Sequence, residues 1–368
     1  MRNSLGPLLR RVTLCALSLA VVATPGGPAV AAPTPPAATE AAAATFAQRY
    51  HALQHGGITR AANTAVTCRK PMVARAVSCA SARGGKAAAN NDFDMFYVDV
   101  DKDPNTYNSS RGEVRLPPGS RVSYARLYWG GNLRVGEQKP PRDNGSALIA
   151  EPGGSYRHVR ADTLVGHRTA HGADAFQASA DVTPLVRSSG AGLYTVAQVN
   201  AAMGHSKAGA WGGWTLVVAY ENEAAPLRHL AVWDGFDSLG GARGRSHAVR
   251  LAGLPVPARA KGSVGMVAYD GDRGATGDTL TVSTGRSRPV RLSDAANPAR
   301  DVLNSTISEP GRQSARTPAY ANTLGYDSDI FRLDGGLKAD RKGLLIRLAS
   351  RRESAWAGVL FAAVDAKR

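Results

Sequence analysis

Residues 213–220 read Gly-Trp-Thr-Leu-Val-Val-Ala-Tyr, and this stretch decides the fold class. It is a run of apolar, β-branched and aromatic residues of strand length, with glycines before it and polar residues after it. Further short apolar runs, bounded in the same way by Gly, Pro, Asn or Asp, occupy residues 95–100, 122–129, 193–199, 230–233, 264–269, 344–348 and 359–364. Helical periodicity between them is nearly absent. The sequence therefore predicts an all-β protein built from sandwiches or jelly rolls.

The strands follow the same order in both halves of the chain, at a nearly constant spacing. The matched positions, first half before second half, are Trp129 and Tyr269, Asp181 and Asp329, and Trp211 and Trp356. This repetition predicts two tandem, jelly-roll-like β-sandwiches that arose by internal duplication. A chance match between generic strand patterns is the alternative, because few residues are identical. Glycines and prolines place the boundary between the halves near residues 240–262.

These patterns divide the chain into five segments. We predict a signal peptide over residues 1–31, a disordered Ala/Pro-rich spacer over 32–45, a leader with a disulfide and a linker over 46–92, a first sandwich over 93–250 and a second over 251–368. We expect the strands at 122–129 and 264–269 to pair with those ending at Tyr220 and Val364, because the longest apolar strands take central positions in a sheet.

The N-terminal segment has the features of a secretory signal peptide. Arg2, Arg10 and Arg11 precede an apolar run over residues 12–23, and cleavage is expected after Ala31. The run is too short to span a bilayer comfortably, and an uncleaved anchor is the alternative. We therefore expect a secreted protein, extracellular or loosely associated with the cell wall, with no membrane span after cleavage.

Composition excludes several classes of protein. The chain is 43% hydrophobic and 20% charged, which is enough apolar material for a buried core. Its net charge of +16 comes from scattered basic residues, whereas nucleic-acid binding concentrates them on one element. An anionic cell-envelope polymer or a surface glycan is the partner we expect, and a solvated basic surface without a partner explains the charge equally well. The sequence does not indicate an oligomeric state.

Cys68 and Cys79 are the two cysteines that remain after export, since Cys15 lies in the signal peptide. An even number of cysteines in an oxidising compartment favours a disulfide between them.

Several stretches together resemble a family of exported actinobacterial surface proteins that is known only as a domain of unknown function. They are residues 91–101, 125–131, 180–183, 213–220 and 304–307. The resemblance covers roughly residues 56–364 and implies a surface protein, found in relatives ahead of repeated β domains and a wall-sorting signal. This chain shows no such signal at its C-terminal end, which puts covalent wall anchoring in doubt. The family supplies no activity or catalytic residues.

Two loops carry alternating carboxylates of the kind that bind calcium. The candidate ligands are Asp99, Asp101 and Asp103 in the first half, and Asp270, Asp272 and Asp278 in the second. The first loop is not an EF-hand, because Pro104 stands where an EF-hand requires glycine. Aspartates that form turns at strand ends are the alternative.

Other candidate chemistry is weaker. Residues 204–208 approach the nucleophile-elbow pattern around Ser206, but no helix is predicted after it. His167 and His171 have zinc-site spacing with glycines on both sides, which argues against a helix. The tryptophans Trp129, Trp211, Trp214 and Trp233 are expected in the core rather than on a ligand platform. No residue is assigned a catalytic role.

The sequence therefore favours a secreted, non-enzymatic β-sandwich protein with a cell-envelope or surface role, as an adhesion or ligand-binding module. The alternative is an exported hydrolase acting on a glycan or an ester. A pocket that holds two convergent carboxylates, or Ser206 within reach of a histidine such as His205, would favour the hydrolase.

Overall fold

The structure is a computed structural model that describes residues 40–42, 44–101, 103–240, 245–251, 256–285, 287–311, 315–334, 337, 343–352 and 354–366. The predicted signal peptide with Ala31 lies outside these residues, as does most of the predicted spacer. No helix within the described segments is long and apolar enough to cross a membrane.

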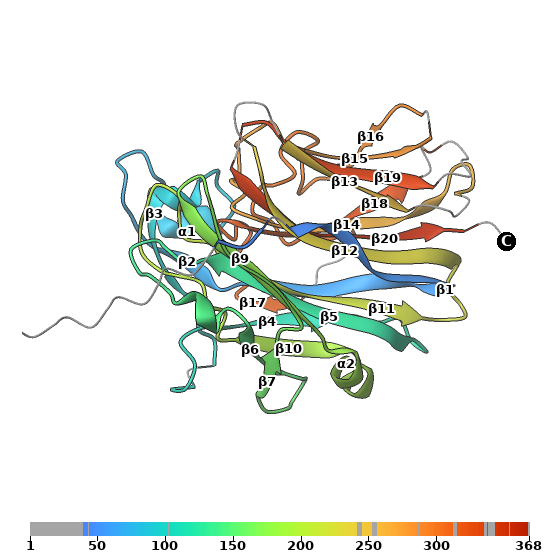
Figure 1. Ribbon diagram of the computed structural model, residues 1–368, viewed down its shortest axis with the longest axis horizontal. Coiled ribbons are helices and arrows are strands. Elements are labelled where there is room, and N and C mark those ends of the chain that lie inside the picture. The colour runs from blue at the N-terminus through green and yellow to red at the C-terminus, as the bar shows by residue number, and fades with distance from the viewer. Residues whose placement is uncertain are drawn as a thin grey trace, which may run out of the picture. The chain divides into compact units, whose positions relative to one another are not determined.

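The protein is all-β, as predicted, and its largest sheet is antiparallel with nine strands (Figure 1). The strand order in this sheet is β18-β14-β20-β12-β1-β11-β5-β9-β8. In that order the strands are Tyr326–Asp334, Lys261–Tyr269, Ala355–Asp365, Leu227–Leu239, Ala44–Thr64, Gly212–Glu221, Arg121–Asn132, Ala173–Asp181 and Thr163–Ala170.

Two smaller antiparallel sheets cover the two halves of the large one. The first has the order β17-β4-β10-β6-β7 and the second β13-β19-β15-β16. The first comprises Arg316–Thr317, Ser109–Val114, Gly192–Ala197, Ser146–Ala150 and Arg157–Arg160, and the second Arg245–Leu251, Leu344–Ser350, Thr279–Thr284 and Val290–Arg291. The remaining elements are the pair β2 (Val66–Pro71) and β3 (Phe93–Tyr97), the helices α1 (Cys79–Arg83) and α2 (Thr183–Ser189), and the 3₁₀ turns η1 (Asn90–Asp92) and η2 (Pro141–Asp143).

The strand pairing defines two complete eight-stranded jelly rolls. In the first roll the sheet β1-β11-β5-β9 faces β4-β10-β6-β7, and in the second β12-β20-β14-β18 faces β13-β19-β15-β16. Each strand of the first roll has a counterpart in the second at the same place in the chain order and in the sheet order. Two sheets of four strands in this connectivity are the jelly-roll arrangement. The predicted tandem architecture is confirmed.

The aromatic pairs of the central strands face different sides of the large sheet in the two rolls. Trp214 lies opposite Trp129 in the first roll, and Trp356 lies opposite Tyr269 in the second. Trp129 and Trp214 lie in the core of the first roll, whereas Tyr269 and Trp356 lie in a separate core together with Trp211. The match of Trp129 with Tyr269 therefore holds for the strands β5 and β14 but not for the two side chains.

The strands that the sequence predicts to be central in their sheets occupy central positions in the structure. β5 pairs with β11 and β14 pairs with β20, as expected from their long apolar runs. β20 lies between β12 and β14, and its residues from Ala355 to Val364 are all buried. All four tryptophans expected in the core are at most 3% exposed.

The domain boundaries differ from those predicted. The segment predicted as a leader contains β1, which is the first strand of the first roll, and β12 is the first strand of the second roll. The two rolls therefore meet in the turn at residues 222–226 and not near 240–262. The reason is that the first half of β1, residues 44–55, carries polar side chains that are partly exposed, so it lacks the apolar signature of the other central strands.

The two rolls pack face to face, so that the protein has four layers of sheet (Figure 1). One core fills each roll, and a third fills the space between the large-sheet strands of the two rolls, around Tyr128, Tyr269 and Trp356. Hydrogen bonds cross this third core: Gln177 donates to the carbonyl oxygens of Gly235 and Gly358 at 3.0 and 3.3 Å. The nine-stranded sheet therefore folds back on itself, and its outer face becomes the contact between the rolls.

We predict that Leu360→Ala lowers the free energy of unfolding by about 2–5 kcal/mol, because it leaves a cavity in the core of the second roll. Leu360 in β20 is fully buried. Val290→Ala on the partly exposed strand β16 is the control and should change stability by no more than about 0.5 kcal/mol. Urea unfolding of both variants checks this, and equal effects would show that β20 is peripheral.

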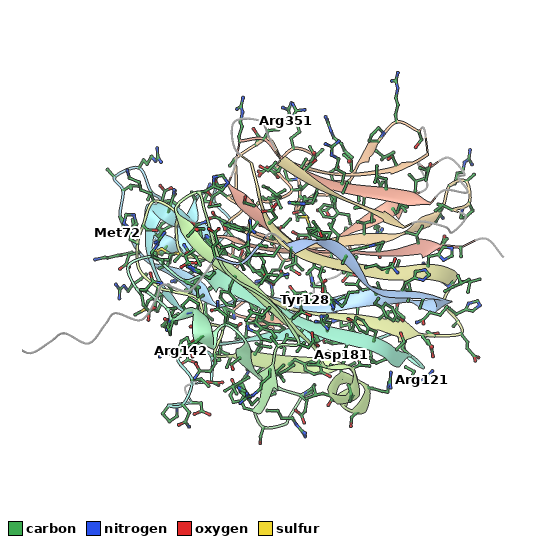
Figure 2. All side chains as sticks on the ribbon, in the orientation of Figure 1. Met72, Arg121, Tyr128, Arg142, Asp181 and Arg351 are labelled. Atoms are coloured by element: carbon green, nitrogen blue, oxygen red, sulfur yellow. A yellow bond between two sulfur atoms is a disulfide. The ribbon has the colours of Figure 1, made fainter. Side chains whose placement is uncertain are left out.

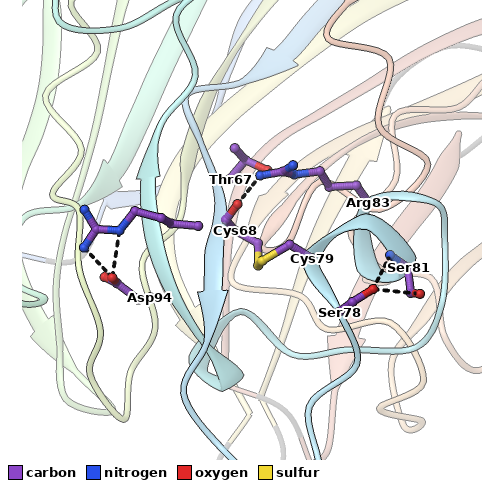
Figure 3. Close-up of a disulfide and its surroundings, with 8 residues drawn as sticks. Thr67, Cys68, Ser78, Cys79, Ser81, Arg83 and Asp94 are labelled. Atoms are coloured by element: carbon purple, nitrogen blue, oxygen red, sulfur yellow. Dashed lines mark hydrogen bonds and ion pairs between the residues drawn. A yellow bond between two sulfur atoms is a disulfide. The ribbon is translucent and has the colours of Figure 1, made fainter.

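A disulfide joins Cys68 in β2 to Cys79 at the start of α1, as predicted (Figure 3). The side chain of Arg83 reaches back from α1, and its Nε donates to Thr67 Oγ1 at 3.1 Å while Nη2 donates to the Cys68 carbonyl oxygen. The bond and these contacts fix the short helix against β2.

Replacing both cysteines by serine should lower the free energy of unfolding by about 3 kcal/mol, because the short closed loop no longer restricts the unfolded chain. Denaturant unfolding of the oxidised wild type and the double variant measures the difference. A stability equal to that of the wild type would contradict a stabilising role for this disulfide.

Candidate functional site

A polar cleft of about 480 Å³ opens where loops of the two rolls meet. The loop after β14, the loop between β19 and β20, the loop between β10 and β11 and the turn between β8 and β9 all contribute to it. The polar side chains in its lining are those of Asn90, Asn91, His171, Lys207, Asp270, Asp272, Thr276, Arg352 and Ser354. The first four come from the first half of the chain and the rest from the second.

Two carboxyl groups stand next to each other in the wall of this cleft. Asn90 Nδ2 donates to Asp270 Oδ1 at 2.9 Å and to Asp272 Oδ1 at 3.3 Å, and the Asn90 backbone N–H donates to Asp272 Oδ1 at 3.0 Å. Asp270 has a φ of 64°, which turns the chain sharply as it leaves β14. Both carboxyl groups therefore accept hydrogen bonds from the same residue, Asn90.

Burial raises the pKa of both carboxyls. The pKa of Asp270 lies well above its ordinary value because the group is buried, and the neighbouring charge of Asp272 raises it further. Burial raises the pKa of Asp272 to about 7, against the hydrogen bond from the Asn90 N–H, which lowers it. A pair of this kind holds a proton near neutral pH, which an ordinary aspartate does not.

Gly209 packs closely against Asn90 and holds its side chain in place. Asn90 begins the turn η1 and is 1% exposed. Gly209, with a φ of 68°, lies so close that a Cβ on it would come within 1.3 Å of Asn90 Oδ1. Only glycine fits there, because the conformation and the space both exclude a side chain. The loop before β11 therefore locks the amide that positions the carboxyl pair.

Cationic side chains line the rest of the cleft. Lys207 and Arg352 are exposed and come from opposite rolls. His171 lies in the turn between β8 and β9 with a φ of 53°. The cleft thus combines a protonatable carboxyl pair with hydrogen-bond donors on its rim, which suits a ligand rich in hydroxyl or other polar groups.

The first predicted calcium loop is a turn. Asp101 Oδ1 accepts the Asp103 N–H at 3.0 Å, and Asp103 Oδ1 accepts the Asn105 N–H at 2.9 Å. Asp99 Oδ1 accepts the Ser109 hydroxyl at 2.7 Å. These carboxylates satisfy the backbone and side chains of their own loop, which is the turn-forming role of aspartate.

The second predicted calcium loop is divided between two places. Asp270 and Asp272 line the cleft, but Asp278 does not. Its Oδ2 accepts the Leu303 N–H at 2.7 Å instead. Among the residues that the structure describes, no three Asp, Glu, His or Cys side chains converge to hold a metal ion. Neither loop therefore gathers the three ligands that were predicted, because hydrogen bonds commit each carboxylate to a separate turn.

Asp278 belongs to a further set of buried acids in the second roll, which we call the buried carboxyl set: Asp278, Asp301, Asp327 and Asp329. Burial raises the pKa of Asp278 to about 6 and that of Asp329 to about 7. The stretch 304–307, quoted above for the family resemblance, supplies donors to this set. Thr306 donates its N–H to Asp327 and its hydroxyl to Asp329, both at 3.1 Å.

The weaker candidates do not form catalytic arrangements. Ser206 Oγ is buried without a hydrogen-bond partner among the described residues, and His205 Nε2 contacts the Asn91 carbonyl oxygen instead. His167 Nδ1 lies 2.9 Å from Asp174 Oδ1, and His171 lines the cleft. The two histidines thus serve separate sites. The nucleophile-elbow and zinc alternatives therefore gain no support.

Sequence reasoning missed Asn90, which stands in the segment predicted as a linker. Its role depends on Asp270 and Asp272, 180 and 182 residues away, so no local pattern marks it. Lys207 and Arg352 were missed for the same reason. The only local signal is the density of glycine and small residues around residues 204–213, which indicates a place of close backbone approach.

Comparison with known proteins gives little. No family model matches the chain, and no curated protein matches it. Among solved structures, a chain from the atomic structure of Sulfolobus turreted icosahedral virus is similar over 84% of this chain and 91% of its own length, at 9% sequence identity and a TM-score of 0.20. A likeness at this level says nothing about function.

The raised carboxyl pKa values predict that stability falls as the pH rises. In the unfolded chain these aspartates titrate near pH 4, and in the folded protein Asp278 titrates near 6 and Asp272 and Asp329 near 7. Folding therefore favours the protonated forms. Their contribution is fully present below about pH 4 and is lost as the pH rises through about 7.

Thermal unfolding between pH 4 and pH 8 measures this contribution. Asp272→Asn, which keeps the shape of the side chain without its charge, should raise the melting temperature at pH 8 relative to the wild type and change it less at pH 5. An equal shift at both pH values would contradict a buried, protonatable Asp272.

Proposed function

We propose that this protein is exported and binds a hydroxyl-rich glycan of the cell envelope in the cleft around Asp270 and Asp272. The observation that supports this most is the cleft itself, in which polar groups from both rolls surround a paired carboxyl. Hydroxyl groups of a sugar both donate and accept hydrogen bonds, so they suit a wall that offers carboxyl oxygens beside Lys207 and Arg352. The predicted signal peptide and the net charge of +16 support a location near an anionic envelope.

The carboxyl pair favours a second candidate function, hydrolysis of a glycosidic bond. Burial and the charge of Asp272 both raise the pKa of Asp270, so Asp270 would hold the proton and donate it to the leaving oxygen. Asp272, ionised above about pH 7, would attack the anomeric carbon as the nucleophile, because two carboxyls that share one amide donor are too close together to hold a water between them. The bond from the anomeric carbon to the leaving oxygen breaks as an Asp272 oxygen bonds to that carbon and Asp270 gives its proton to the leaving oxygen. Asp270, now ionised, then takes a proton from a water whose oxygen bonds to the anomeric carbon as the bond to Asp272 breaks, so that both carboxyls return to their starting states.

Binding is tested by sedimentation of the mature chain with insoluble peptidoglycan and with a neutral insoluble polysaccharide. Asp272→Asn should weaken retention about tenfold or more, because one charged hydrogen-bonding group in the cleft is lost. The matched control is Asp103→Asn, the same change in the turn of the first roll, which should bind as the wild type does. Equal binding by both variants would place the ligand elsewhere.

Release of reducing ends from the same polymers separates a binding protein from an enzyme. If the second candidate is correct, Asp272→Asn lowers turnover by about 10²–10⁴-fold, whereas Asp103→Asn leaves it unchanged. The rate of the wild type should rise as the pH passes about 7, where Asp272 ionises. Binding without any release of reducing ends supports the binding function and rules out hydrolysis of these polymers.

A further inference from the structure

A second cavity, of about 430 Å³, lies between the two rolls, lined by β1, β4 and the segment of the second roll that includes residues 296–321. Two arginines line it: Arg60 from β1 and Arg316 from β17. Neither arginine lines the cleft around Asp270 and Asp272.

Arg60 is a buried cation that forms no ion pair with any residue that the structure describes. The residue is 1% exposed, and its guanidinium donates from Nε to the Ser328 carbonyl oxygen at 3.1 Å and from Nη2 to the Ser308 carbonyl oxygen at 2.9 Å. Both acceptors are neutral, and the carboxyls of Asp329 and Glu309 act on Arg60 only through their charges. A buried charge without a directly bonded counter-charge is expensive, because its lost hydration is not fully replaced.

Arg316 repeats this situation beside it. Its Nη2 donates to the Tyr320 carbonyl oxygen and its Nη1 to that of Pro318 at 3.4 Å, so its partners are neutral as well. Burial and the positive charge of Arg60 lower the pKa of Arg316 to about 10, although the charge of Asp329 acts in the opposite direction. Two like charges that are close enough to repel each other thus face one cavity.

The carboxyls nearby are engaged elsewhere. Glu113, on the cavity wall, accepts Arg115 Nε at 2.6 Å and the Ala315 N–H at 3.0 Å. Asp329 Oδ1 accepts both the N–H and the hydroxyl of Ser308 at 2.8 Å, and its pKa of about 7 leaves it partly neutral. Asp329 and Glu309 act on Arg60 through their charges, and Glu309 lines the same cavity, but no carboxylate of a described residue lies within ion-pair distance of either guanidinium.

We propose that this cavity binds a small oxyanion between Arg60 and Arg316. Guanidinium groups bind carboxylate and phosphate oxygens through paired, charge-assisted hydrogen bonds, and an anion here would supply the counter-charge that the described residues do not. Ser308, whose carbonyl oxygen accepts from Arg60, lies in the same wall. The anion has one chemistry and two sources, the carboxylate of an acidic sugar or a free or polymer-bound phosphate.

Thermal unfolding tests the proposal, with sodium phosphate, sodium sulfate and sodium glucuronate each compared with sodium chloride at equal ionic strength. The wild type should show a saturable rise in melting temperature with at least one oxyanion, because a ligand that binds only the folded state stabilises it. Preference for glucuronate would identify an acidic sugar as the source, and preference for phosphate a phosphate group.

Arg316→Gln should raise the anion concentration needed for half of this stabilisation about tenfold or more, because a charged hydrogen-bond donor is lost. The matched control is Arg351→Gln, the same change on an exposed arginine that points away from the sheets (Figure 2), and it should respond as the wild type does. In chloride alone Arg316→Gln should be no less stable than the wild type, since it removes one of two repelling charges.

Should Arg316→Gln fail to fold, Arg316→Lys keeps the charge, loses the paired donors and should still weaken the response. The proposal is overturned if no oxyanion gives a saturable response in the wild type. It is equally overturned if a folded Arg316 variant responds at the same anion concentrations as the wild type, since both arginines would then serve only to tie backbone carbonyls together.

Discussion

The structure depends on β1, the strand that hydrogen-bonds to both jelly rolls. Residues 44–55 pair with β12 of the second roll, and residues 56–64 pair with β11 of the first. Gly56 stands where the neighbour changes, with a φ of 150°, and a Cβ there would lie 1.9 Å from the Tyr220 carbonyl oxygen. Because one strand continues through both pairings, the sheets of the two rolls form a single surface that folds back on itself, and this folding creates the third core and both cavities.

The strands that the sequence predicted are those buried on both faces. β5, β11, β14 and β20 show as apolar runs because each is covered by a small sheet on one side and by the other roll on the opposite side. β1 was missed because its first half keeps polar side chains on a partly exposed face. β12 was predicted only over residues 230–233, since His229 and Asp234 interrupt its apolar run although both are buried. The boundary between the rolls was misplaced for that reason.

The candidate sites could be predicted only in part from short stretches of sequence. Asp270 and Asp272 were singled out as carboxylates at a strand end, but the calcium interpretation followed from spacing alone, whereas the partner that defines their chemistry is Asn90 from a distant segment. Arg60 and Arg316 had no signal at all in a chain rich in arginine. In both places burial is the dominant cause of the shifted pKa, raising it for the carboxyls and lowering it for the guanidinium groups, and burial is set by the packing of two rolls.

The double role of β1 has a consequence for how the chain must fold. Its partners are far away in sequence: Arg49 in β1 and Asp234 in β12 are joined by an ion pair across 185 residues. A chain made from its N-terminus presents β1 long before β11 and β12, so both edges of this strand stay open until residues 212–239 have followed. Structures dominated by such distant pairings fold slowly, and open strand edges invite association with other chains. We therefore expect this protein to refold slowly from denaturant and to aggregate more during refolding as its concentration rises.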